Sequence, residues 1–154
     1  MKTKLFIIIS VMIPIFLSSV LILGKFLSVS TNVAEVEISG KTFLVEVADE
    51  EKERNKGLSG RKTLGEDEGM LFIFETPTTP VFWMKDMEIP IDIVWISEGK
   101  IVGWVPNVLP EPGVKDENLS IYTPSQSVDM VLELSAGTVS REKFFQGEGV
   151  SLKL

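Results

Sequence analysis

Asp92 is the residue whose type and position first suggest chemistry, because it stands inside the apolar run "IPIDIVWI" (89–96). An ionised carboxylate is very costly to bury without partners, so such a group is either paired or protonated. Arg54, Arg61 and Lys85 are the candidate partners, and the planar guanidinium of arginine can satisfy both carboxylate oxygens. We expect Asp92 to be buried in a central strand and paired with Arg61 or Arg54 in a structural role. The alternative is a role in a functional site, where perturbed carboxylates cluster.

Glu133 is a second carboxylate that could take part in chemistry. Either Asp92 or Glu133 could serve a carboxylate-dependent hydrolase, with Arg61 or Lys85 as the electrostatic stabiliser. A carboxylate pair that works as acid and base needs two carboxyl groups opening on one cleft, about 5–9.5 Å apart in glycoside hydrolysis. A binding domain needs only a lined groove. The positions of the two carboxyl groups therefore distinguish a hydrolase from a binding domain.

The absence of histidine and cysteine excludes several kinds of site. Without them there is no Cys or His nucleophile, no His/Cys zinc site, no axial histidine for haem and no cysteine-bound iron–sulfur cluster. A metal would have to be bound by carboxylates and carbonyls, as calcium and magnesium are. We expect no cofactor, no metal site and no tightly bound transition metal.

The N-terminal segment has the features of a membrane anchor. Lys2 and Lys4 precede 19 residues without charge, Leu5 to Leu23. As a helix this stretch spans about 28 Å, close to the thickness of the hydrocarbon core of a bilayer. Lysines before the segment favour a cytoplasmic N-terminus. We expect residues 1–32 to be an anchor with its linker and residues 33–154 to form one domain outside the cytoplasm. The alternative is a cleaved signal peptide, with "SVS" (28–30) as the cleavage site and a secreted product.

The charge of the remaining chain restricts its partners. Beyond the N-terminal segment there are 22 acidic and 12 basic residues, a net charge of −10. Such a surface disfavours nucleic acid and anionic lipid. The expected partners are the membrane, through the N-terminal helix, and an envelope protein or a small ligand.

The hydropathy pattern predicts a mainly β domain. Alternating residues around the turn 39–41 indicate a hairpin, and Asp49 to Gly57 indicate a short helix. Further strands are predicted at 70–74, 81–84, 91–96, 101–105, 120–123 and 128–134, and a second helical turn near 138–146. Many short strands between Gly, Pro and Asn signals favour an antiparallel β-sandwich or barrel with short helical insertions.

One hairpin can be aligned from the sequence. A two-residue turn at Glu98–Gly99 pairs Ile96 with Ile101 and Trp95 with Val102. Trp95 and Trp104 then share one apolar face, which favours packing in the core over sugar binding for the tryptophans. In the same alignment Gly103 lies diagonally beside Asp92 and leaves room for a long partner side chain.

Several motifs together resemble the uncharacterised family known as domain of unknown function 192. They are "EKERNKGLSGR", "GMLFIF", "FWMKDMEIPIDIVWI", "YTP", "VDMVLELSAG" and "GEGV", spread from Val36 to Leu152. The chain departs from the family pattern at Ser59–Gly60 and at Glu148. The resemblance implies a jelly-roll-like β-sandwich, often exported or anchored, without an established activity, substrate or cofactor. The matching positions include Arg54, Gly57, Leu58, Arg61, Gly69, Met70, Phe72, Phe74, Trp83, Met84, Lys85, Ile89, Asp92, Tyr122, Leu132, Glu133, Gly137 and Gly147.

The candidate site is a polar cluster with a binding or structural role. It consists of Arg54, Arg61, Trp83, Lys85, Asp92, Tyr122 and Glu133. The favoured function is a membrane-anchored extracytoplasmic β-domain that binds a ligand or an envelope partner without catalysis. The alternative is the carboxylate-dependent hydrolase, acting on an envelope or extracellular substrate.

Overall fold

The computed structural model describes residues 32–153. The predicted membrane or signal helix lies outside the described residues. Between Asn32 and Lys153, no helix is both long enough and apolar enough to cross a membrane.

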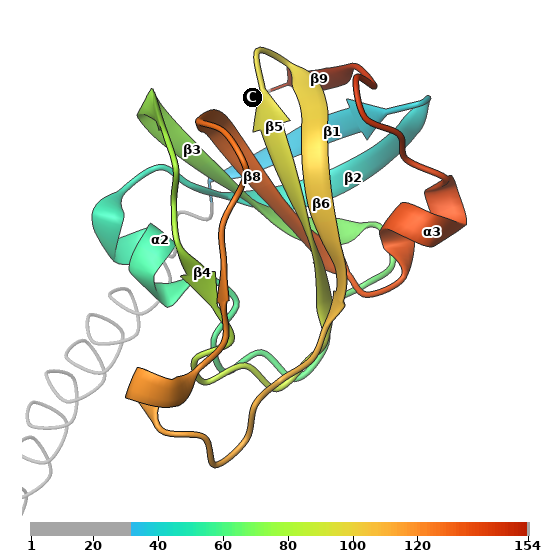
Figure 1. The fold of residues 1–154 in the computed structure, drawn as a ribbon. Coiled ribbons are helices and arrows are strands. Elements are labelled where there is room, and N and C mark those ends of the chain that lie inside the picture. The colour runs from blue at the N-terminus through green and yellow to red at the C-terminus, as the bar shows by residue number, and fades with distance from the viewer. Residues whose placement is uncertain (1–31, 154) are drawn as a thin grey trace, which may run out of the picture. The chain divides into compact units, whose positions relative to one another are not determined.

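The described residues form a mainly β domain, as the hydropathy pattern predicts (Figure 1). The strands belong to one seven-stranded sheet in the order β6-β5-β8-β3-β2-β1-β9 and to a separate ribbon of β4 and β7. The pair β2–β3 is parallel and the other neighbours are antiparallel, so the predicted antiparallel arrangement is only partly right. The elements are β1 (Val33–Ile38), β2 (Lys41–Ala48), α2 (Glu51–Lys56), β3 (Glu68–Thr78), β4 (Phe82–Trp83), β5 (Ile91–Ser97), β6 (Lys100–Val108), η2 (Asp116–Asn118), β7 (Ile121–Tyr122), β8 (Val128–Ser135), α3 (Thr138–Glu142) and β9 (Val150–Lys153).

The large sheet curls until its two edges meet, so the fold is one curled sheet and not two separate packed sheets. Residues just before β9 bond to the start of β6, at the opposite edge. The Ile101 amide donates to the Glu148 carbonyl at 2.9 Å, and the Gly147 amide donates to the Ile101 carbonyl at 2.7 Å. The Val150 amide donates to the Gly99 carbonyl at 2.8 Å. These bonds satisfy backbone groups that two free sheet edges would leave exposed.

The curled sheet has an apolar core on each of its faces. The inner core lies inside the curl and includes side chains from all seven strands and from α3, among them Phe43, Leu71, Val94, Leu132 and Phe144. The second core lies on the other face, beneath α2 and the β4–β7 ribbon, and includes Leu58, Phe72, Met84, Ile93 and Val131. Figure 1 shows α2 and β4 on the left of the sheet and α3 on the right. Strand β5 contributes to both cores, which explains why its sequence is apolar at nearly every position.

The β5–β6 hairpin begins as predicted and then departs from the predicted alignment. Glu98 and Gly99 form the turn with positive φ, and Ile96 pairs with Ile101. Trp95, however, pairs with Gly103, because Val102 is an extra residue in β6 and forms a bulge. This shift of one residue moves the β6 side chains that follow the bulge to the other face, until a second shift between Ile91 and Ile93 restores the original side at Val108.

The bulge separates the tryptophans that the simple alignment placed together. Trp95 is buried in the second core, whereas Trp104 packs against the inner core. Trp95 and Trp104 thus pack in the core as predicted, although in different cores, whereas Trp83, which was placed in the candidate site, is 53% exposed. The space predicted beside Asp92 is also absent, because Gly103 lies opposite Trp95.

Helix α2 starts one residue later than the sequence predicts. Its N-cap is Glu50 in place of Asp49, and Glu50 forms a capping box with Glu53. The helix ends at Gly57, which adopts a φ of 49° that glycine tolerates well. This short helix carries several of the side chains described below.

Gly69 in β3 is a position where a side chain would collide with the sheet. A β-carbon there would lie 2.5 Å from the carbonyl oxygen of Glu133 and 2.9 Å from Cδ2 of Leu134. We expect Gly69→Ala to lower the free energy of unfolding by about 1–3 kcal/mol, the usual cost of overpacking. Gly103→Ala is the matched control, since its new carbon would meet nothing closer than Trp95 at 3.5 Å. Urea titration of both variants tests this prediction, and equal losses of stability would contradict it.

Candidate functional site

Asp92 is completely buried, as predicted, but its partners are backbone amides and not arginine. Its Oδ1 accepts hydrogen bonds from the amides of Asn107 at 2.7 Å and Gly137 at 3.0 Å. Its Oδ2 accepts one from the amide of Val139 at 2.8 Å. The carboxylate thereby joins β5 to the end of β6 and to the start of α3. This arrangement supports the structural role and corrects the predicted ion pair.

The basic residues proposed as partners of Asp92 are engaged elsewhere. Arg61 forms an ion pair with Glu46 on β2, and Lys85 forms one with Asp116 of η2. The hydrogen bond and the negative charge of Asp116 raise the pKa of Lys85. The predicted pair between Asp92 and Arg61 is therefore wrong, because Arg61 has a carboxylate partner of its own.

Arg54 is held by backbone carbonyls and by an aromatic ring. Its guanidinium donates to the carbonyl of Asp49 and, at 3.2 Å, to the carbonyl of Ile73. The guanidinium carbon also lies 5.7 Å from the centre of the Phe74 ring, a cation–π distance. Arg54 thus fastens α2 to β3.

The segment after α2 is attached to the loop between β4 and β5. The Ser59 hydroxyl donates to the Lys85 carbonyl, and the Gly60 amide donates to the Asp86 carbonyl, both at 2.8 Å. We expected Asp92 to bind this segment to the sheet; these two hydrogen bonds attach it to the β4–β5 loop instead. They also hold α2 close to β4.

Asp92 and Glu133 lie on opposite faces of the sheet. In the β5–β8 pairing, Asp92 is opposite Leu134 and Ile93 is opposite Glu133. Residues that pair across a sheet point to the same side, and neighbours along a strand point to opposite sides. Asp92 therefore points with Leu134 toward the inner core, and Glu133 points with Ile93 toward the second core.

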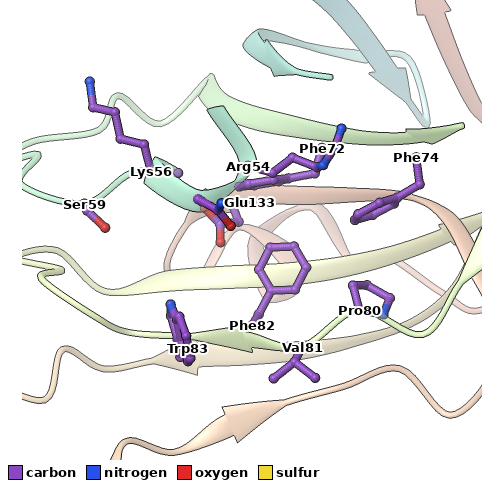
Figure 2. A pocket seen from close by; sticks show the side chains of 12 residues that line it. Arg54, Lys56, Ser59, Phe72, Phe74, Pro80, Val81, Phe82, Trp83 and Glu133 are labelled. Atoms are coloured by element: carbon purple, nitrogen blue, oxygen red, sulfur yellow. The ribbon is translucent and has the colours of Figure 1, made fainter. Parts of the chain in front are cut away.

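Glu133 lines a pocket of about 220 Å³ between α2, β3 and β4. Figure 2 shows the Phe82 ring beside Glu133, with Trp83 on one side and Phe74 and Pro80 on the other. The lining residues are Arg54, Asn55, Lys56, Gly57, Ser59, Phe72, Phe74, Pro80, Val81, Phe82, Trp83 and Glu133. Glu133 is the one carboxylate among them.

Aromatic packing holds the wall of this pocket in place. The centre of the Phe82 ring lies 4.9 Å from the centre of the Phe72 ring and 5.6 Å from that of Trp95, and both pairs meet edge-on. Phe82 pairs with Tyr122 across the β4–β7 ribbon, so Tyr122 supports the wall from behind without lining the pocket. Trp83, which lines the pocket, and its ribbon partner Ile121, which does not, are both exposed.

The carboxyl group of Glu133 is buried without compensation. The residue is 5% exposed, and its Oε2 has no hydrogen-bond partner within residues 32–153. Removal from water disfavours the charged form and raises the pKa of Glu133 from 4.5 to about 8. At neutral pH the group is therefore mostly protonated.

The pocket unites only part of the cluster predicted from the sequence. Arg54, Trp83 and Glu133 line it, whereas Arg61, Lys85, Asp92 and Tyr122 do not. Sequence reasoning missed the apolar lining, although the alternation in "LFIF" places Phe72 and Phe74 on the same side of β3. Within the described part of the chain, no group of three or more Asp or Glu residues is arranged to hold a metal ion.

Two solved structures resemble this domain. One is a protein from Sinorhizobium meliloti 1021, provisionally described as a transcription regulator, with 28% identity and a TM-score of 0.68 over 77% of this chain and 91% of that one. The other is a protein of unknown function from Novosphingobium aromaticivorans DSM 12444, with 25% identity and a TM-score of 0.66 over 77% of this chain and 83% of that one. No curated protein matches the sequence.

The motifs that carry the family resemblance extend over most of the described domain. The family model for domain of unknown function 192, described as "Uncharacterized ACR", matches residues 34–152. These residues include every strand from β2 to β8 and the whole lining of the Glu133 pocket. The chain belongs to the family of domain of unknown function 192.

Proposed function

We propose that this protein is a membrane-anchored, extracytoplasmic binding domain whose pocket over Glu133 takes a small ligand without catalysis. The observation that carries the proposal is a buried carboxyl group that lines an aromatic pocket and whose Oε2 has no hydrogen-bond partner among the residues that the structure describes. A desolvated carboxyl without a partner lowers the stability of a fold. A ligand that reaches Glu133 would supply the missing partner.

The composition of the pocket suits binding better than hydrolysis. Binding pockets combine apolar walls with a few polar groups, and here Phe72, Phe82 and Trp83 surround one carboxyl. Acid and base catalysis by carboxylates needs two such groups on one cleft. Asp92 points to the other face of the sheet, so it does not complete a pair with Glu133.

A panel of small aromatic probes tests the binding function. Calorimetric titration of the full-length protein in detergent with benzylamine, benzyl alcohol and phenylacetate should give saturable binding for one or more of them. Trp83→Ala should weaken that binding by tenfold or more, because it removes the exposed wall of the pocket. Leu44→Ala is the matched control, since Leu44 is similarly exposed but does not line the pocket. No binding of any probe at millimolar concentration would overturn the proposal.

The proposed location follows from the sequence of the N-terminal segment and from charge. Lys2 and Lys4 before 19 uncharged residues support a cytoplasmic N-terminus with the domain on the other side of the membrane. The net charge of −10 beyond that segment speaks against nucleic acid as a partner.

We expect the native protein to fractionate with membranes and to keep its N-terminal segment. Membrane fractionation followed by mass spectrometry of the intact protein checks this. Accessibility of the domain to protease added outside spheroplasts checks the orientation. A soluble product that begins near Thr31 would show that the segment is a cleaved signal peptide.

A further inference from the structure

We propose that the Glu133 pocket selects a primary ammonium group carried on a short apolar stem, with Glu133 as its carboxylate partner. This inference rests on the proposed binding function and names the chemical class of the ligand. An ammonium group carries three N–H donors, and a carboxylate offers acceptors for them. Oε2 of Glu133 is such an acceptor, buried and without a partner in the described part of the chain.

The cationic residues of the pocket do not compensate Glu133. Arg54 donates to the carbonyl groups of Asp49 and Ile73, and its guanidinium lies over Phe74. Figure 2 shows the amino group of Lys56 pointing away from Glu133. No ion pair joins Glu133 to a basic side chain within the described residues. Glu133 is therefore available to pair with a cationic group of a ligand.

The other neighbours of Glu133 leave its charge uncompensated as well. Across the sheet it faces Met70 on β3 and Ile93 on β5, both apolar. Glu46, one strand beyond Met70, is already paired with Arg61. The charged groups that line the pocket with Glu133 are thus Arg54 and Lys56.

The aromatic walls suit the rest of such a ligand. Phe72, Phe82 and Trp83 offer ring surface to an apolar stem and attract a cation through their π faces. A volume of about 220 Å³ restricts the guest to a small molecule or a single side chain. The net charge of −10 beyond the N-terminal segment attracts cations and repels anions at a distance.

Binding of an ammonium group to Glu133 has a consequence for protons. With a pKa of about 8, Glu133 is protonated in about nine-tenths of free molecules at pH 7. The ammonium group keeps its own proton, and the carboxyl proton of Glu133 passes to the buffer. Binding should therefore release most of one proton at pH 7 and strengthen about 10- to 100-fold between pH 6 and pH 8.

The experiment extends the calorimetric titration of the full-length protein to pH 6, 7 and 8. At pH 7, two buffers of different ionisation enthalpy give the number of protons released. We expect benzylamine to bind more tightly than benzyl alcohol or phenylacetate, with proton release and the rise in affinity described above. Benzyl alcohol should show neither effect. A lysine side chain of another protein would offer the same chemistry, and Nα-acetyl-lysine methylamide tests that source in parallel.

Glu133→Gln separates this inference from the proposed function. The variant keeps the size of the side chain and should lose both the preference for benzylamine over benzyl alcohol and the proton release. Glu35→Gln is the matched control, because it removes a carboxylate on the exposed side of β1 and should change nothing. If benzyl alcohol or phenylacetate binds and benzylamine binds no better, the ammonium inference is overturned and the binding function stands. If no probe binds, the binding function itself fails.

Discussion

Glu133→Gln is expected to abolish most of the pH dependence of stability between pH 4.5 and pH 8. In the folded protein burial raises the pKa of Glu133 to about 8, whereas the unfolded chain has the ordinary value of 4.5. Between these values the folded state holds a proton that the unfolded state has lost. The stabilising contribution is therefore fully present below pH 4.5 and is lost as the pH rises through 8.

The size of this effect follows from the difference between the two pKa values. At about 1.4 kcal/mol for each unit, wild type should lose about 4–5 kcal/mol of unfolding free energy between pH 4.5 and pH 9 through this one group. Glutamine does not ionise, so the variant should be the more stable protein above pH 8.

Urea titrations of wild type and Glu133→Gln at pH 4.5, 6, 7, 8 and 9 measure the effect. Glu35→Gln is again the matched control and should follow wild type at each pH. Parallel curves for wild type and Glu133→Gln would show that the carboxyl group of Glu133 is solvated or paired in the folded protein.

Asp92→Asn is expected to lower the free energy of unfolding by about 2–4 kcal/mol. The carboxylate accepts amide hydrogen bonds on both oxygens, from Asn107, Gly137 and Val139. The amide of asparagine has one oxygen, and its NH₂ group would face an amide donor. At least one buried N–H would lose its partner and meet another donor, in a place without access to water.

Double-mutant analysis distinguishes these amide partners from the arginine partner predicted from sequence. Arg61 pairs with Glu46 and not with Asp92, so the effects of Asp92→Asn and Arg61→Ala should add. Asp67→Asn is the matched control, because its carboxylate is exposed and pairs with Lys41 at the surface, where ion pairs contribute little. A coupling above about 1 kcal/mol between Asp92 and Arg61, or a wild-type melting temperature for Asp92→Asn, would contradict the assignment.

The local features of this domain could be predicted from the sequence. Alternation of apolar and polar residues locates the strands, and the residues from Asp49 to Gly57 indicate α2 to within one or two positions. The turn at Glu98–Gly99 and the burial of Asp92 were also predicted correctly. Each of these depends on neighbouring residues alone, so the sequence carries the information directly.

The course of the hairpin beyond its turn depended on the rest of the fold. The bulge at Val102 lies in an apolar stretch whose residues suit either face, so no pattern marks the shift. The extra residue places Trp104 against the inner core and leaves Trp95 in the second core. The face of the sheet to which each of these side chains points is decided only by the packing of the two cores against the sheet.

The sequence by itself determined that this is a mainly β domain with a carboxylate buried in a central strand, because burial and periodicity are local properties. The tertiary structure alone decided what that carboxylate binds and where the pocket lies. The amides of Gly137 and Val139 are 45 and 47 residues from Asp92 in the sequence. A backbone amide is not tied to a residue type, so the sequence does not indicate which amides bind the carboxylate. The pocket forms where α2, β3, β4 and β8 meet, and the position of Glu133 there follows from the strand order.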